Sequence, residues 1–116
     1  MARHEDFLIE QGTDVSMDLY CFNADGSTKD LTGYNVVASI ARKHGVSDSD
    51  KVYFEPYIMV PPSDGVINLI LTNEKTSALN KRINYVYDVE ISFSDSDGDT
   101  YVERILEGVL RVNPSV

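Results

Sequence analysis

The chain has 116 residues, of which 19 are acidic and 10 are Lys or Arg, so its formal net charge at pH 7 is −9. This acidic balance argues against a nucleic-acid partner, because binding to phosphates needs a concentrated cationic surface. No apolar run approaches the ~20 residues that cross a bilayer, so no membrane partner is expected. The charged start MARHEDFLIE lacks the apolar stretch of a secretory signal. We therefore expect one non-exported globular domain over residues 1–116.

The residue types needed for catalysis are scarce. Cys21 is the only cysteine, and His4 and His44 are the only histidines. Zinc sites need several such ligands at defined spacing, and Cys21 lies in an apolar run where a buried thiol is expected. No nucleophile elbow, P-loop or dinucleotide motif is present. Alternating carboxylates such as Asp88 and Glu90 are typical of a solvated strand face. We predict a protein that is not an enzyme and has no cofactor.

Short β-type runs alternate with turn signals along the whole chain. Pro56 interrupts the fourth run, and because proline cannot donate to a sheet ladder, this run should be an edge strand or be broken by a bulge. Gly108 is predicted to form a bulge in the last run. The predicted strands are, in chain order, residues 7–10, 14–22, 35–41, 51–60, 66–72, 84–93 and 100–112.

One short helical piece is predicted over residues 72–79, with Thr72 or Asn73 as its N-cap and Leu79 pointing inward. The tyrosines that follow, Tyr85 and Tyr87, are placed so that a hydroxyl can bond back to this corner, as in immunoglobulin-type sandwiches. The predicted fold class is therefore all-β: an immunoglobulin-like β-sandwich of about seven strands with one short helical turn between the fifth and sixth strands. A small β-barrel is the alternative.

The stretch DSDGD places Asp95, Asp97 and Asp99 at alternate positions, like the first ligands of a calcium loop. That loop also needs Gly at its sixth position and Glu at its twelfth, where this chain has Thr100 and Leu106. Strong strands flank the stretch, so the prediction is a hairpin turn. If the tip binds calcium weakly, these three aspartates are the candidate metal ligands; no other metal site is expected.

Several phrases occur together in an order that resembles a known family. They are IEQGTD (9–14), DLTGY (30–34), GVINLILT (65–72), KTSAL (75–79), YVYDVEI (85–91) and ERILEGVLRVNPSV (103–116). The chain is similar to small β-sandwich virion structural proteins of tailed bacteriophages, and in particular to the immunoglobulin-like domain of phage baseplate upper proteins. The resemblance covers residues 9–116 and rests on the joint order of these phrases.

The resemblance implies a non-enzymatic virion protein, assembled in the host cytoplasm and placed in the tail, baseplate or neck by contacts with other virion proteins in a homo-oligomer or symmetric array. A capsid decoration protein is an alternative. A carbohydrate- or calcium-binding module is an alternative of another class, although no Trp is present to stack on a sugar. The candidate interface residues are Tyr53, Phe54, Tyr57 and Ile58, because their spacing puts apolar groups on both faces of a strand.

Overall fold

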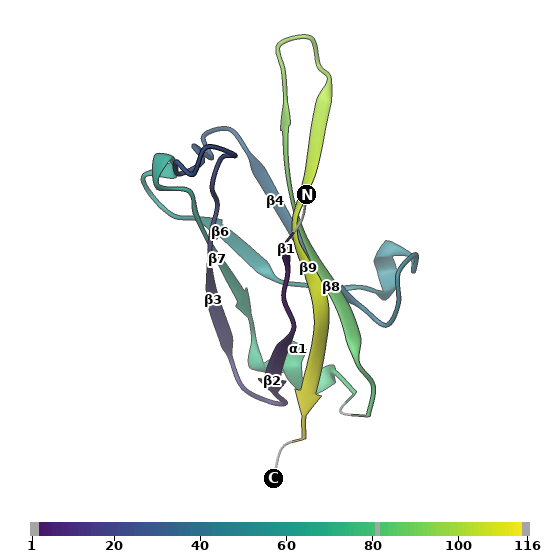
Figure 1. Ribbon diagram of the computed structural model, residues 1–116. Helices are drawn as coiled ribbons and strands as arrows, with labels where there is room; N and C mark the ends of the chain where they lie inside the picture. Colours follow the sequence, from purple (N-terminus) through teal and green to yellow (C-terminus); the bar gives the residue numbers. More distant parts are fainter. Residues whose placement is uncertain (1–2, 81, 115–116) are drawn as a thin grey trace.

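The computed structural model describes residues 3–80 and 82–114, which form two β-sheets packed face to face (Figure 1). The strands are β1 (Arg3–His4), β2 (Phe7–Glu10), β3 (Val15–Tyr20), β4 (Asn35–Ala41), β5 (Val52–Tyr53), β6 (Glu55–Ile58), β7 (Val66–Leu71), β8 (Tyr85–Ser94) and β9 (Thr100–Asn113). One sheet has the order β1-β9-β8-β4-β5, with β2 also paired to β9. The other has the order β3-β7-β6. Two separate sheets exclude the closed-barrel alternative and confirm the sandwich prediction.

Each of the seven predicted runs forms a strand, and the fourth run divides between the two sheets. β5 pairs with β4 in the six-stranded sheet, whereas β6 pairs with β7 in the three-stranded sheet. The chain crosses between the sheets at Phe54, which is 4% exposed and donates its N–H to the carbonyl of Ala38. Pro56 lies in β6, an edge strand, as its missing N–H requires.

The core forms where the alternating apolar residues of the two sheets meet. On β7 the buried residues are Ile67, Leu69 and Leu71, and on β8 they are the alternate residues from Tyr85 to Ile91. Because side chains alternate across a strand, a period of two in the sequence buries one whole face of each strand. Each fully buried aliphatic side chain contributes roughly 1.5–3 kcal/mol relative to its exposed state.

The predicted helical piece is α1 (Asn73–Ala78), which lies between β7 and β8. Thr72 occupies the N-cap position, but its side chain makes no capping bond. Instead, the Asp14 carboxylate accepts the N–H of Asn73 at 2.7 Å. Thr72 is therefore the N-cap residue, as predicted, but the oxygen that accepts the first N–H of the helix belongs to Asp14, in the turn before β3, which folding brings to the start of α1.

The corner after α1 has the predicted tyrosine bond. Leu79 is buried at the end of α1, and the hydroxyl of Tyr85 accepts the N–H of Asn80 at 2.7 Å. Tyr87 has a different partner, because its hydroxyl donates to the carbonyl of Glu5 in the link between β1 and β2. Two tyrosines on one strand therefore secure two separate segments.

The bulge in β9 does not lie at Gly108, as the sequence had indicated. Val89 pairs with Leu106 but Glu90 pairs with Arg104, so Ile105 is the extra residue. A bulge needs no glycine when its residue keeps a negative φ, and the described non-glycine residues all do so.

Gly108 is instead a point of close approach. The N–H of Glu5 donates to the carbonyl of Glu107 at 2.9 Å, which brings the main chain of Glu5 against Gly108. A Cβ at position 108 would overlap the carbonyl of Glu5. Only glycine lets the β1–β2 link pass this close to β9.

The ends of β8 and β9 project beyond the sandwich as a two-stranded hairpin, seen at the top of Figure 1. The pairing of β4 with β8 reaches Ser92, opposite Asn35, and goes no further. Beyond it, Phe93 pairs with Tyr101 and Ser94 with Thr100.

No helix in the described ranges is long and apolar enough to span a bilayer.

Candidate interaction surfaces

The aspartate-rich stretch forms the turn of the projecting hairpin, which confirms the hairpin prediction. One oxygen of the Asp95 carboxylate accepts the N–H groups of Asp97 at 3.0 Å and of Asp99 at 2.9 Å. Gly98 has a φ of +84°, a conformation that glycine adopts readily. Asp95 thus stabilises the turn itself.

Across residues 3–80 and 82–114, no group of three or more His, Cys, Asp or Glu is arranged to hold a metal ion. Asp95, Asp97 and Asp99 do not form such a group.

A row of aromatic rings runs from the sandwich onto the projecting hairpin. Tyr34 meets Phe93 edge to face, and Phe93 stacks on Tyr101, with ring centroids 5.1 Å apart in each pair. The ammonium of Lys29 lies 5.2 Å from the ring centroid of Tyr34. Such aromatic cross-strand pairs stabilise a two-stranded ribbon that would otherwise be marginal. The hairpin is therefore a supported projection, with Val102 exposed on it.

The four predicted interface residues do not lie together. Phe54 is in the core, and Ile58 packs against the core from the inner face of the three-stranded sheet. Tyr53 is half-buried on the six-stranded sheet, whereas Tyr57 is 53% exposed on the opposite side of the molecule. The four residues do not form one surface because the chain changes sheet at Phe54, so that these neighbours in sequence face different surroundings.

Tyr57 belongs to another exposed group, which the sequence had not revealed. On the outer face of the three-stranded sheet, Tyr20 pairs with Val66, whose carbonyl accepts the N–H of Met59 at 2.9 Å. Tyr57 occupies the neighbouring row of the same sheet. We define the outer patch as Tyr20, Tyr57 and Met59, all exposed. The alternation in β3 does place Tyr20 on the solvent face, and this was the available signal.

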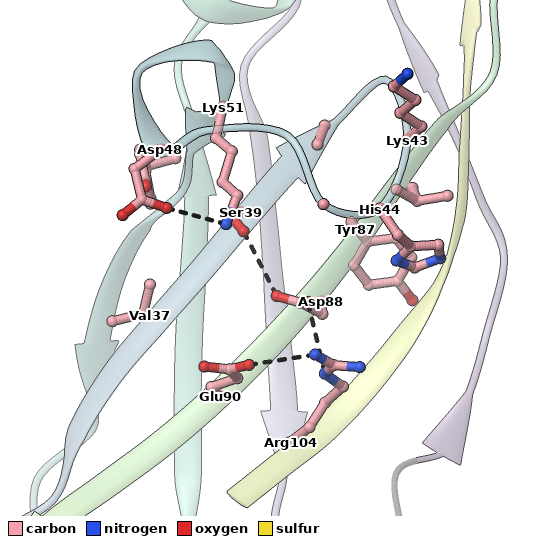
Figure 2. Close-up of a pocket in the computed structure, with 14 residues that line it drawn as sticks. Val37, Ser39, Lys43, His44, Asp48, Lys51, Tyr87, Asp88, Glu90 and Arg104 are labelled. Atoms are coloured by element: carbon pink, nitrogen blue, oxygen red, sulfur yellow. Dashed lines mark hydrogen bonds and ion pairs between the residues drawn. The ribbon is translucent and has the colours of Figure 1, made fainter. Parts of the chain in front are cut away.

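A concavity of about 590 Å³ lies on the outer face of the six-stranded sheet, beside the segment of residues 42–51 (Figure 2). Arg104 lies on its floor, with Nε 3.5 Å from Asp88 and Nη2 3.4 Å from Glu90. Nη1 is 3.5 Å from Glu107. The charge of Asp88, followed by the contacts with Glu90, raises the pKa of Arg104. The carboxylates of Asp88 and Glu90 are thus ion-pair partners of the Arg104 guanidinium.

The wall of the concavity carries a second ion pair. Lys51 lies 3.1 Å from Asp48, and the hydrogen bond to Asp48 raises the pKa of Lys51. On the same segment Arg42, Lys43 and His44 are exposed, and none of the three has an ion-pair partner among residues 3–80 and 82–114. Figure 2 shows Lys43 at the edge of the concavity and His44 over the sheet. Lys43 and His44 line the concavity, whereas Arg42 lines a neighbouring hollow that Asp50 shares; we call Arg42, Lys43 and His44 the basic rim.

Cys21 is buried, as expected from its apolar run. Burial raises the pKa of its thiol, and the nearby charges of Arg3 and Lys29 oppose this only in part. The thiol is therefore protonated at neutral pH, which is the unreactive form.

Comparisons with known proteins bear on the fold alone. No family model matches the chain, and no curated protein matches it. Among solved structures, the chain is similar to that of murine CRIg, with 16% sequence identity and a TM-score of 0.51 over 94% of this chain and 92% of that one. That neighbour is an immunoglobulin-like domain. The chain therefore has an immunoglobulin-like β-sandwich fold, as its sequence predicts.

Proposed function

We propose that this chain is a non-enzymatic structural protein of a tailed-phage virion, held in the tail, baseplate or neck by protein–protein contacts. The sequence phrases that resemble phage β-sandwich proteins support the setting. The observation that carries the mode of action is the outer patch, where Tyr20, Tyr57 and Met59 gather on one exposed sheet face.

The outer patch has the chemistry of a protein-binding surface. Contiguous exposed apolar groups on a soluble protein mark interaction sites, and tyrosines are frequent anchors within them. Asn68 lies beside Tyr57 in the register, and its side-chain amide donates to Asp18 at 2.8 Å. The patch therefore has a polar border, as interfaces commonly have. Its strands β3 and β6 are both edges of their sheet, so a partner can also pair with their main chains.

The test is incorporation of a patch variant into particles that lack the wild-type protein. We expect Tyr20→Ser combined with Tyr57→Ser to reduce incorporation about tenfold or more, since two anchors are lost. Leu8→Ser is the matched control, because Leu8 is exposed on β2, away from the patch. Circular dichroism verifies that each variant is folded.

Two outcomes would contradict the proposal. If the folded double variant is incorporated as well as wild type, the outer patch is not the docking surface. If antibody labelling viewed by electron microscopy finds the protein on the head, at a copy number that matches the head lattice, the protein decorates the capsid instead of the tail.

A further inference from the structure

The concavity of about 590 Å³ has a floor that four strands of the six-stranded sheet build together. Ser39 on β4 pairs with Tyr53 on β5 and with Asp88 on β8. Two residues further along β8, Glu90 pairs with Arg104 on β9. Residues directly opposite one another in a sheet share a face, and all five of these line the concavity. Figure 2 shows Ser39, Asp88, Glu90 and Arg104 along this floor.

The polar groups of the floor hold one another only loosely. The hydroxyl of Ser39 lies 3.5 Å from Asp88, and the guanidinium of Arg104 lies 3.5 Å from Asp88 and 3.4 Å from Glu90. Ordinary hydrogen bonds between such groups measure about 2.5–3.0 Å. Within residues 3–80 and 82–114, none of these four side chains makes a shorter hydrogen bond. Ser39 is only 8% exposed, so a buried hydroxyl lines the concavity without a bond of normal length.

The charges that line the concavity cancel at neutral pH. Three cations, Lys43, Lys51 and Arg104, stand with three carboxylates, Asp48, Asp88 and Glu90. A ligand of either charge would therefore meet as many like charges as opposite ones.

The nearest groups outside the lining add no attraction for an anion. Glu107 lies 3.5 Å from Arg104, and Asp50 lines the neighbouring hollow; both are acidic. The lining thus favours a ligand without net charge that offers several hydrogen-bonding groups.

We propose that this concavity binds a neutral saccharide. Tyr53 packs against the apolar face of a sugar ring, and Asp88, Glu90 and Arg104 bond its hydroxyls. A sugar ring presents C–H groups that pack on an aromatic ring, while its hydroxyls can both donate to carboxylates and accept from a guanidinium. This inference goes beyond the proposed function, because it assigns a second binding activity to the sheet that does not carry the outer patch.

Tyr53 is placed for this role. Its carbonyl accepts a bond from Nζ of Lys75 at 2.7 Å, and its pairing with Ser39 holds β5 against β4. Its ring is half-buried, so one part stays open to a ligand. At ~4.8 Å between strands, the main chains at Tyr53 and Asp88 are about 10 Å apart. The volume of the concavity lies within the range of about 300–1,000 Å³ that is common for small-molecule sites.

NMR titration of isotope-labelled protein tests the proposal. The probes are maltose, lactose and chitobiose as neutral disaccharides and digalacturonic acid as the acidic one, each raised to millimolar concentration. We expect at least one neutral probe to shift the amide signals of residues 37–53, 86–90 and 104 in a saturable way. The acidic probe should bind about tenfold more weakly or not at all, because the lining offers no excess of positive charge.

Variants of the floor locate the site. Asp88→Asn combined with Glu90→Gln keeps the shape of both side chains and removes their charge, so affinity should fall about tenfold or more. Tyr53→Leu leaves the ion pairs of the floor in place and removes the aromatic ring, and it should also weaken binding about tenfold. The matched control is Glu10→Gln combined with Glu55→Gln, which removes two exposed carboxylates outside the concavity and should leave affinity unchanged. Circular dichroism verifies that each variant is folded.

Several results would overturn the proposal. They are the absence of saturable shifts with all three neutral probes, binding of digalacturonic acid as tight as that of the neutral probes, shifts confined to the outer patch, and unchanged affinity in the folded floor variants. The combined Tyr20→Ser and Tyr57→Ser variant should bind saccharide as wild type does, and Tyr53→Leu should enter particles normally. These two measurements separate failure of the saccharide site from failure of the proposed function.

Discussion

Tyr85 shows how one side chain secures a turn in this protein. Its ring is buried at the start of β8, and its hydroxyl accepts the N–H of Asn80 at the corner after α1. Without this acceptor the N–H of Asn80, which now lies in a partly buried hydrogen bond, would lose its partner within the chain. A buried donor left unpaired costs more than a typical hydrogen bond contributes.

We therefore expect Tyr85→Phe to lower the free energy of unfolding by about 1–2 kcal/mol, measured by urea denaturation. The matched control is Tyr57→Phe, since the ring of Tyr57 is exposed. This control should change stability by less than about 0.5 kcal/mol. Equal effects of the two substitutions would show that the corner bond contributes nothing.

Among the elements, β9 organises the edge of the six-stranded sheet. It pairs with β8 on one side, and on the other side with β1 and β2 in parallel. The link between β1 and β2 passes directly over Gly108, where it is held by the bond from Glu5 to Glu107 and by the hydroxyl of Tyr87. The absence of a side chain at Gly108 is thus a requirement of strand pairing.

We expect Gly108→Ala to destabilise the protein by about 1–3 kcal/mol, because the added methyl group displaces Glu5. In a chain that lacks residues 1–5, the same substitution should cost much less, since the carbonyl of Glu5 then no longer lies over position 108. Urea denaturation of the four proteins gives the coupling energy. An equal cost in both backgrounds would mean that Gly108 is needed for the conformation of β9 itself.

At the scale of the whole molecule, acidic residues control the response to pH. Two aspartates hold loops by accepting bonds from residues two positions on: Asp25 from Ser27 and Asp30 from Thr32. The hydroxyl bonds, followed by the N–H bonds, lower the pKa of both carboxyls. A folded-state pKa below the unfolded one contributes stability that is complete above the unfolded pKa and is lost as pH falls through the folded pKa.

We expect the urea midpoint of wild type to fall as the pH is lowered from about 5 toward about 2. A variant with Asp25→Asn and Asp30→Asn should show a shallower fall, because these two positions no longer take up protons. NMR titration of the Asp30 carboxyl should also show a higher pKa in Thr32→Val than in wild type. Parallel pH profiles for variant and wild type would contradict the assignment.

Local sequence was a good guide wherever the deciding contacts lie within one strand or one turn. The alternation from Tyr85 to Ile91 predicts the buried face of β8, and DSDGD predicts the hairpin turn, as found. It was a poor guide where distant segments meet. No local sequence pattern shows that the chain crosses between the sheets at Phe54. No residue near Gly108 in the sequence indicates that Glu5 packs against it.

The candidate surfaces follow the same division. Tyr57 was recognised as an exposed aromatic, but its partners in the outer patch include Tyr20, from a strand far away in sequence.

By itself the sequence determined that this protein is a two-layered β structure with short turns, because a period of two in hydrophobicity buries one face of each strand whatever its neighbours are. Only the tertiary structure decided which strands share a sheet, which side chains meet on the outer faces, and where the main chain must come close enough to require glycine. Those features depend on contacts between residues distant in the chain, which no local pattern encodes.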